Sequence, residues 1–388
     1  MSASLVTGAN FGRKSNFRTS DMLPIAETLS ASGELKQIVC QINAGSPFPG
    51  TVGAIPNIVR FPLRVLEKYA GLSLSRQVQD RIFDFFAAWR LKRVDVTFIH
   101  GGFFMPRTVA RARALGNTVV DISVNAEIAS NSKLEHEELA NLGYPAFAGT
   151  YTRLLEETAP LLDLDYLLLM SEYTKRTYLE AGYPADRIFI AHIDVDTERF
   201  KAHERKEGEP FRVLYLAFTQ PLKGVHYLLD AWESLSLPNS ELRIVGDYSA
   251  MPKELEEAYR RRIAKNPTIV WRPGTQTPEA EFKNASVYVF PTLTEGFGRS
   301  ALEALACGLP VITTEHAPGI VKDGVTGYIV PIRSGEAIAE KIRYLYEHPE
   351  EAKRMGEAAR QSVLDKKPFG KMVEEIYGEI MRRKGKQV

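Results

Sequence analysis

Short apolar runs alternate with amphipathic segments through the second half of this 388-residue chain. The runs lack polar alternation, which is typical of strands that are buried on both faces of a sheet. Strands that alternate with helices predict a parallel sheet with right-handed crossover connections. The predicted strands are 213–218, 242–245, 269–271, 287–290, 311–313 and 328–330, and the predicted helices are 225–235, 252–265, 300–306 and 337–347.

The first half follows the same pattern less regularly. Its Gly- and Pro-rich segment at residues 45–61 predicts a long loop, and a long loop in a compact domain is often functional. The predicted strands of this half are 5–7, 37–42, 94–100, 118–124, 166–170 and 187–192.

A polar segment at residues 201–210 separates the halves and has the composition of an exposed linker. At about 150 residues per domain, the length corresponds to roughly two to three domains. We therefore expect one Rossmann-like domain at residues 1–200 and a second at 205–365. The apolar spacing near the end predicts a last amphipathic helix at about 367–388, which we expect to pack back on the first domain.

Charge and cysteine content narrow the class of protein further. The chain carries 49 basic and 48 acidic residues, so no broad positive field favours a nucleic-acid partner. Cys40 and Cys307 lie far apart in apolar runs, which predicts buried thiols in a reducing compartment. The N-terminus does not resemble a signal peptide, and no run reaches the roughly 20 apolar residues of a membrane span. We therefore expect a cytoplasmic protein.

One helical pattern in the first half leaves two interpretations open. Apolar residues at positions 78, 82, 85, 86 and 89 keep helical spacing, and basic residues surround them. Packing into the core is the simpler interpretation, because an amphipathic helix usually buries its apolar face. A helix that lies on a membrane surface is the alternative, so peripheral membrane contact stays open.

The most informative segment reads VFPTLTEGFGRSALEALACGLP and predicts a strand, a glycine-containing loop and a helix. Gly296 and Gly298 allow backbone amides to approach a ligand closely, and the start of a helix favours an anion. Glu295 precedes this helix and Glu303 lies in its first turns, so both carboxylates can flank one crevice at the carboxyl end of a strand. Carboxylates accept paired hydroxyl hydrogen bonds, which suits a sugar or a ribose.

Simpler interpretations of this segment exist. Ser300 and Glu303 form a capping-box pattern, and the glycines alone could form a tight turn. A nicotinamide or flavin enzyme is disfavoured, because Gly8 and Gly12 after the first predicted strand have the wrong spacing for a dinucleotide fingerprint.

The wider context resembles a known family. Glu295-Gly-Phe-Gly-x4-Glu303, followed by Gly-Leu-Pro at 308–310, resembles the E-x7-E signature of GT-B retaining glycosyltransferases of the glycosyl transferases group 1 (GT4-like) kind. This fold is α/β, with two Rossmann-like doubly wound domains that face each other across a cleft. The resemblance implies that the second domain holds the donor and the first domain holds the acceptor.

Other segments support the resemblance. Pro-Leu-Lys-Gly at 221–224 and Asp-Gly-x-Thr-Gly at 323–327 match the family near the two ends of the second domain. The stretch 171–200 resembles the passage of the family between its domains. The resemblance covers roughly residues 150–380 well and the N-terminal part only in outline.

The resemblance implies a role for each matching residue. Glu303 would accept hydrogen bonds from the ribose hydroxyls of a nucleoside diphosphate sugar. Glu295 would contact the transferred sugar, helped by the backbone amides of Phe297 and Gly298. Lys223 would bind the diphosphate, where a compact cation offsets the charge that grows as the bond to the sugar breaks. The other donor-side candidates are Gly296, Arg299, Ser300 and, where the family contacts the base, Arg272; a solvated surface position is the alternative for Lys223 and for Arg272.

One departure affects the diphosphate site. The family commonly has Gly-Arg five to six residues before the phosphate-binding lysine, where this chain has Ala217 and Phe218. The second phosphate-binding cation is therefore missing at this place. Thr219, Gln220, Arg299 or an arginine of the first domain would have to replace it, or donor binding would be weak.

A second departure affects the acceptor side. The family often has a histidine after a strand of the first domain, and His100 is the nearest substitute by position, with a structural role at the strand end as the alternative. Gly12 and Arg13 lie in a loop at residues 8–18 that could meet an anionic or lipid-linked acceptor, although it could also be merely solvated. Glycan, lipid-linked and small-molecule acceptors all stay open.

The resemblance implies an enzyme of EC class 2.4, a hexosyltransferase-type glycosyltransferase that uses a nucleotide-sugar donor. Retention by front-face attack needs no protein nucleophile, so positioning and electrostatic stabilisation would carry catalysis. A catalytically degenerate GT-B partner protein that binds a nucleotide or a glycan is the main alternative, and a sugar-nucleotide epimerase or phosphorylase is another. We expect no cofactor and no metal, because the Asp-x-Asp pairs at 163–165 and 194–196 fall at an element junction and between the domains.

Overall fold

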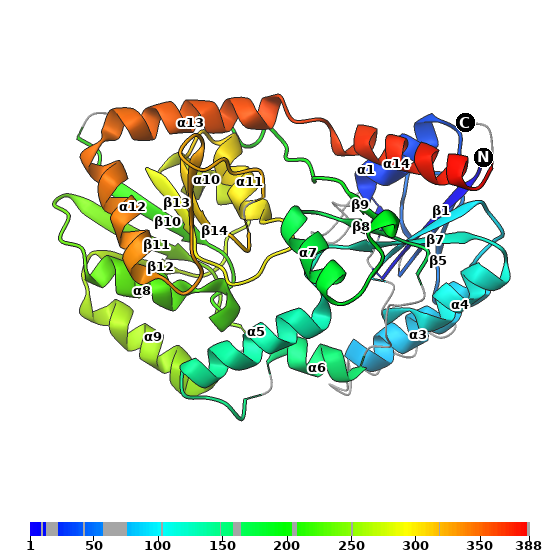
Figure 1. Cartoon of the computed structure of the whole chain (residues 1–388), viewed down its shortest axis with the longest axis horizontal. Coiled ribbons are helices and arrows are strands. Elements are labelled where there is room, and N and C mark those ends of the chain that lie inside the picture. Colours follow the sequence, from blue (N-terminus) through cyan, green and yellow to red (C-terminus); the bar gives the residue numbers. More distant parts are fainter. Residues whose placement is uncertain are drawn as a thin grey trace.

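Two parallel β-sheets form two domains that lie side by side along the long axis of the molecule (Figure 1). The computed structural model describes residues 1–8, 11–12, 22–41, 43–56, 76–101, 104–147, 149–157, 164–203, 208–249, 251–317 and 319–385. Within these ranges, no helix is both long enough and apolar enough to cross a membrane.

The first sheet has seven strands in the order β5-β3-β1-β6-β7-β8-β9. Every residue of the central strand β1 is buried, as expected for a parallel strand that is covered on both faces. The strands are β1 Ala3–Thr7, β3 Leu35–Cys40, β5 Thr51–Gly53, β6 Val96–His100, β7 Thr118–Ser123, β8 Tyr166–Leu169 and β9 Ile188–Ile190, and a separate pair joins β2 Phe11–Gly12 to β4 Asn43–Ala44.

The second sheet has six strands in the order β12-β11-β10-β13-β14-β15, again with parallel pairing throughout. All four residues of β13 and of β14 are buried, which agrees with their uninterrupted apolar or small side chains. The strands are β10 Phe211–Leu216, β11 Ser240–Val245, β12 Ile269–Arg272, β13 Val287–Phe290, β14 Val311–Thr314 and β15 Gly327–Val330.

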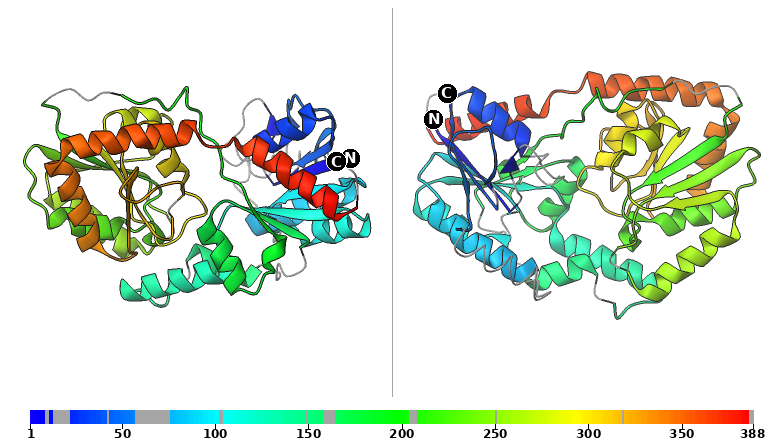
Figure 2. Two further views of the ribbon diagram at one scale, coloured as in Figure 1. Left: turned by 45° about the horizontal axis from the view of Figure 1, so that its top comes forward. Right: turned by 180° about the vertical axis from the view of Figure 1, so that it is seen from behind.

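Helices cover both faces of each sheet (Figures 1 and 2). The helices up to the domain junction are α1 Leu23–Ala31, α3 Arg76–Arg90, α4 Pro106–Ala114, α5 Ile128–Asn141, α6 Thr150–Glu157, α7 Glu172–Glu180 and the short 3-10 helix η4 Ala185–Arg187. Those that follow are η5 Pro221–Lys223 (also 3-10), α8 Val225–Glu233, α9 Lys253–Lys265, α10 Pro278–Lys283, α11 Arg299–Ala306, α12 Gly335–Glu347, α13 Pro349–Leu364 and α14 Phe369–Arg383.

The last helix returns to the first domain. Figure 1 shows α13 along the second domain and α14 beside α1 of the first. The two helices approach so closely that a Cβ on Gly370 would lie 2.5 Å from Thr28 Oγ1. Asp194 holds the crossing point, because its carboxylate accepts hydrogen bonds from Lys366 Nζ at 2.7 Å and from the backbone N–H of Phe369. The chain therefore passes between the domains twice.

The long-loop prediction for residues 45–61 is wrong in part, and residues 57–61 lie outside the described ranges. The segment contains β5, which pairs with β3 along residues 38–40. The outer edge of β3 would otherwise leave its backbone N–H and C=O groups unpaired. A strand of three residues is too short for periodicity to detect.

Core packing, the simpler interpretation of the helical pattern near residue 85, is wrong for two of its aromatic residues. Phe85 is 52 % exposed and Trp89 is 70 % exposed on α3. The opposite face of the same helix is already buried through Phe83 and Ala87. A helix on the outside of a sheet buries only one of its faces, so the second apolar stripe of α3 stays in solvent.

Candidate active site

A glycine turn joins β13 to α11 at the carboxyl end of the second sheet. Gly298 has a φ of 87°, in the left-handed region that favours glycine, and directly precedes α11. The helix therefore begins at Arg299, and the capping-box interpretation of Ser300 and Glu303 is wrong. Ser300 Oγ instead accepts a hydrogen bond from Tyr288 OH at 2.7 Å.

Lys223 lies against this turn. It ends η5, and the next residue, Gly224, has a φ of 68° and packs so tightly that a Cβ there would lie 2.0 Å from the carbonyl oxygen of Pro291. This close packing brings Lys223 Nζ to the carboxylate of Glu295, with which it forms an ion pair. The two side chains are 15 % and 21 % exposed, so water screens this ion pair less than a surface one.

Glu303 lies half-buried on α11. It forms no hydrogen bond or ion pair with any residue that the structure describes. Burial raises the pKa of its carboxyl to about 7, and the nearby Arg299 and Arg199 oppose this rise only in part. Such a half-buried carboxylate has lost hydration without gaining hydrogen bonds from the described residues. A ligand whose hydroxyl groups donate hydrogen bonds to this carboxylate would therefore be stabilised there.

The substitution Glu303→Gln tests whether the pKa of this carboxyl group is raised in the folded chain. The pKa of Glu303 in the folded chain, about 7, lies above the reference value of 4.5, so its contribution to stability is complete below about pH 4.5 and is lost as the pH rises through 7. We expect Glu303→Gln to melt about 2–4 °C above the wild type at pH 8 and little above it at pH 5. Thermal melts at the two pH values measure this. Glu340→Gln, at an exposed position of α12, should leave the melting temperature unchanged at both pH values. Equal shifts of the melting temperature by Glu303→Gln at pH 5 and pH 8 would contradict the raised pKa.

The segment after β10 supplies no cation at the two positions where the family has Gly-Arg. Phe218 is 62 % exposed there. Thr219 is buried, and its hydroxyl has no hydrogen-bond partner within the described part of the chain. Gln220 is half-buried beside it, and its backbone N–H donates to the carbonyl oxygen of Phe218 at 3.1 Å.

Arg272 lies farther from the turn than the other donor-side candidates. It ends β12, which is separated from β13 by β11 and β10, or about 14 Å at the usual strand spacing. Its exposed guanidinium lies 3.5 Å from the carboxylate of Glu281. A ligand that touched both Arg272 and Glu295 would have to be extended.

The glycine turn also contacts the first domain. A Cβ on Gly296 would lie 1.6 Å from the carbonyl oxygen of Val124, which follows β7. Ser171 Oγ, at the start of α7, donates a hydrogen bond to the carbonyl oxygen of Gly296 at 2.6 Å. The carboxyl ends of both sheets therefore meet at this turn, and only glycine fits at the contact.

Two further side chains of the first domain reach the same loop. Tyr173 OH donates to Thr294 Oγ1 at 3.2 Å, and Thr294 Oγ1 donates to Asn131 Oδ1 at 2.6 Å. All three residues are buried. The sequence pattern did not single out any of them as a contact, since each contact joins residues more than 120 positions apart.

The structure describes two of the three candidate site residues of the first domain. His100 ends β6 and pairs in register with Ile122 of β7, so it lies at the same sheet edge as Val124. Gly12 lies in β2, and Arg13 lies outside the described residues.

His192 is a histidine that sequence reasoning missed. It follows β9, and its ring centroid lies 5.4 Å from that of Phe297 in the glycine turn. Burial, and then the charge of Lys366, lower the pKa of His192. Its position at the end of a predicted strand, as for His100, was the signal that could have identified it.

A buried carboxylate joins α5 to the second domain. Glu138 is fully buried and accepts hydrogen bonds from three side chains of that domain: His226 Nε2 at 2.7 Å, Tyr227 OH at 2.7 Å and Arg333 Nε at 2.8 Å. Burial alone would raise the pKa of Glu138, but the hydrogen bonds from His226 and Arg333 hold it below its usual value. The same helix also contacts η5, which carries Lys223.

Known proteins share this fold and parts of this sequence. HepE from Anabaena, solved in complex with UDP-glucose, superposes with a TM-score of 0.66 at 13 % identity over 98 % of this chain and 100 % of that one. Sucrose-phosphate synthase from Thermosynechococcus elongatus superposes with a TM-score of 0.72 at 18 % identity over 98 % of each chain. The fold predicted from the sequence is therefore confirmed as GT-B, the two-domain class of glycosyltransferases.

Sequence comparisons point to the same family. Residues 196–362 match the family model of the glycosyl transferases group 1, which confirms the resemblance found in the sequence. The capsular polysaccharide biosynthesis glycosyltransferase CapM of Staphylococcus aureus is 32 % identical over 184 residues, which cover 44 % of this chain and 48 % of CapM. The chain spans about half the length of the curated relatives it matches.

Proposed function

We propose that the protein is a retaining glycosyltransferase that moves a sugar from a nucleoside diphosphate sugar to an acceptor hydroxyl. The observation that carries the proposal is the meeting of Lys223 and Glu295 at the glycine turn. Glu303, on the helix that follows, has no hydrogen-bond partner among the described residues. The match of residues 196–362 to glycosyl transferases group 1 and the UDP-glucose complex of HepE support a nucleotide-sugar donor.

The charges of the site suit an extended, anionic donor. Glu303 would accept hydrogen bonds from the ribose hydroxyls, and Arg272 lies on the side where the base would extend. Lys223 would bind the diphosphate and offset the negative charge that develops on the leaving phosphate. The leaving phosphate oxygen would take the acceptor proton on the front face, so that this chain supplies position and charge rather than a nucleophile. Lys223 and backbone dipoles would do this without a metal or other cofactor.

Donor binding would exchange one partner of Lys223 for another. In the structure, Lys223 Nζ pairs with the carboxylate of Glu295. A diphosphate carries more negative charge than one carboxylate and would compete for the ammonium group. Glu295 would then be released to accept hydrogen bonds from the hydroxyls of the transferred sugar.

A thermal-shift screen tests the donor proposal. We expect at least one of UDP, GDP, ADP and their sugars to raise the melting temperature, because a ligand at 100 times its dissociation constant adds about 2.7 kcal/mol of stability. Slow hydrolysis of the matching nucleotide sugar without acceptor would then demonstrate turnover. Stabilisation without any turnover would favour the catalytically degenerate alternative, and no stabilisation by any of these ligands would contradict the donor proposal.

The exposed Phe218 provides a second test. We expect Phe218→Arg to tighten binding of the donor diphosphate about tenfold, because a guanidinium near Lys223 adds a charge-assisted hydrogen bond to phosphate. Phe218→Gln, which removes the ring but adds no charge, should leave the affinity within about twofold. Calorimetric titration with the nucleoside diphosphate measures both. Equal affinities of the two variants would show that this position does not face the phosphates.

A further inference from the structure

Helix α3 has two apolar faces. The inner face packs against the first sheet through Phe83 and Ala87, which are 2 % and 0 % exposed. The outer stripe consists of Val78, Phe85 and Trp89, at a spacing of seven and then four residues, which places them on one side of the helix. Packing against the first sheet explains the apolar residues of the inner face but not those of the outer stripe.

The outer stripe is exposed along its whole length. Val78 is 40 % exposed, and Phe85 and Trp89 are more so. Exposed side chains of this size that occur singly need no explanation, but three on one stripe form a patch that an apolar partner would cover.

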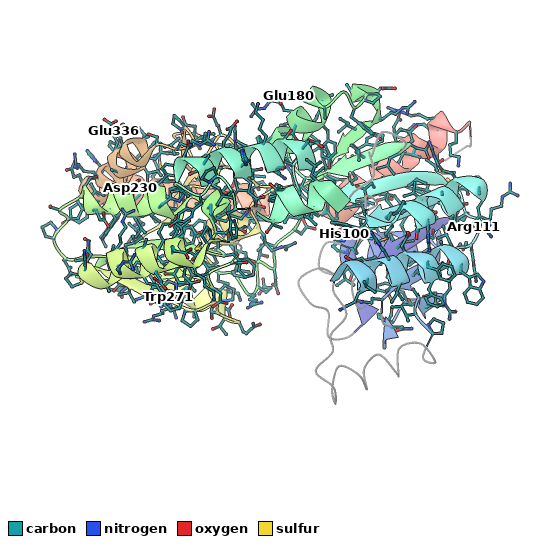
Figure 3. All side chains as sticks on the ribbon, turned by 90° about the horizontal axis from the view of Figure 1, so that it is seen from below. His100, Arg111, Glu180, Asp230, Trp271 and Glu336 are labelled. Carbon is teal, nitrogen blue, oxygen red and sulfur yellow. The ribbon has the colours of Figure 1, made fainter. Side chains whose placement is uncertain are left out.

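Guanidinium groups stand over both aromatic rings. Arg107 Cζ of the neighbouring helix α4 lies 5.6 Å from the ring centroid of Phe85, and Arg90 Cζ lies 5.5 Å from that of Trp89. Figure 3 shows Arg111 of α4 extending away from the ribbon into solvent. The apolar stripe is therefore bordered by cationic side chains of two packed helices.

The charge of this region stands out in a chain whose net charge is only +1. Residues 76–117 contain eight basic and three acidic residues. One of the three acids, Asp84, is 3 % exposed and accepts hydrogen bonds from the backbone N–H groups of Arg107 and Thr108 at the start of α4. The basic residues are Arg76, Arg81, Arg90, Lys92, Arg93, Arg107, Arg111 and Arg113.

We propose that the α3–α4 surface, the stripe Val78, Phe85 and Trp89 with the basic residues around it, binds the surface of an anionic lipid bilayer. Aromatic side chains are stable at the boundary between headgroups and acyl chains, and arginines bind lipid phosphates above it. A bilayer covers both parts of this surface, because its interfacial region takes up the apolar stripe and its phosphates neutralise the arginines. This inference goes beyond the proposed transfer reaction and is tested without donor or acceptor.

Binding of the full-length chain to lipid vesicles tests the proposal. We expect co-sedimentation with vesicles of phosphatidylcholine and phosphatidylglycerol, and much weaker co-sedimentation with pure phosphatidylcholine. Binding should fall as salt rises from about 0.1 M to about 1 M, because the Debye length shortens from about 10 Å to about 3 Å. Trp89 should shift its emission to shorter wavelength on binding, and Trp89→Phe should abolish this shift, since the other two tryptophans, Trp232 and Trp271, are buried and half-buried in the second domain.

Two sets of variants separate the apolar and the charged contributions. Phe85→Ser with Trp89→Ser should abolish co-sedimentation. Arg107→Gln with Arg111→Gln should weaken it about thirtyfold, because each basic side chain near an anionic surface contributes about a factor of five. Leu364→Ser, a matched change at an exposed apolar position of α13, should have no effect. All of these positions are exposed, so we expect melting temperatures within about 2 °C of the wild type.

Three outcomes would overturn the proposal. The first is equal binding to neutral and anionic vesicles, and the second is binding that survives Phe85→Ser with Trp89→Ser. The third is a dimer, seen by sedimentation at the same protein concentration without lipid, that these serine substitutions dissociate. That result would assign the α3–α4 surface to a second copy of the chain instead.

Discussion

Lys223→Ala is expected to lower kcat/KM for sugar transfer by about a hundredfold to a thousandfold, the usual cost of removing one group that stabilises charge in a transition state. The ammonium group is held at the glycine turn by the tight packing of Gly224 on Pro291. No other cation follows β10 before Lys223, because Ala217 and Phe218 stand where the family has Gly-Arg. The loss should therefore not be shared with a neighbour in this segment.

Matched variants separate this effect from a loss of folding. Lys341→Ala removes a half-buried lysine that pairs with Glu340 on α12, far from the glycine turn in sequence, and it should leave kcat/KM unchanged. Lys223→Arg should recover part of the rate, since it restores the charge but not the compact geometry. Initial rates of transfer, or of donor hydrolysis, measure all three variants once the donor is known. A Lys223→Ala enzyme within threefold of the wild type would contradict the proposed role.

Glu138→Ala is expected to destabilise the protein by about 3–5 kcal/mol, the usual cost of removing one partner from a buried ion pair. Glu138 has no exposed surface, and its removal leaves Arg333 and His226 without their acceptor at the contact between α5 and the second domain. Because the pKa of Glu138 is lowered on folding, its contribution is present at neutral pH and is lost as the pH falls through the folded-state value. The difference from the wild type should therefore shrink in acid.

The neighbouring Glu137 supplies the control. It also pairs with Arg333, but its side chain is 42 % exposed, so Glu137→Ala should cost at most about 1 kcal/mol. Urea unfolding at pH 7 and at pH 4 measures both variants. Similar losses for the two substitutions, or a Glu138→Ala loss that grows in acid, would contradict the assignment.

Most strands and helices of the second domain could be predicted because they carry a complete local pattern, whereas the helices α10 and α13 were missed. The predicted strand at 287–290 agrees with β13, since a strand buried on both faces requires a continuous apolar run. The pattern near residue 85 was less informative. Spacing shows that a helix has an apolar stripe, but only the packed sheet shows which stripe is buried.

The contacts of the candidate site could likewise be predicted from the sequence only in part. Glu295 and Glu303 lie eight positions apart in one strand-turn-helix unit, so their proximity to one crevice could be inferred from the sequence. The ion pair between Lys223 and Glu295 joins residues 72 positions apart, and sequence reasoning placed them together only through the family resemblance. His192 and Ser171 reach the turn from the other domain, and no local pattern indicates such a contact.

The sequence by itself determined the alternation of strands and helices, the glycine turn and its two carboxylates, because each depends on residues a few positions apart. The tertiary structure alone decided that Gly296 touches the backbone after β7, that Glu138 is shared between the domains, and that Phe85 and Trp89 face solvent. These features depend on which surfaces of the sheets and helices meet in the folded chain. That choice is made by the summed packing of the whole chain and not by any one segment.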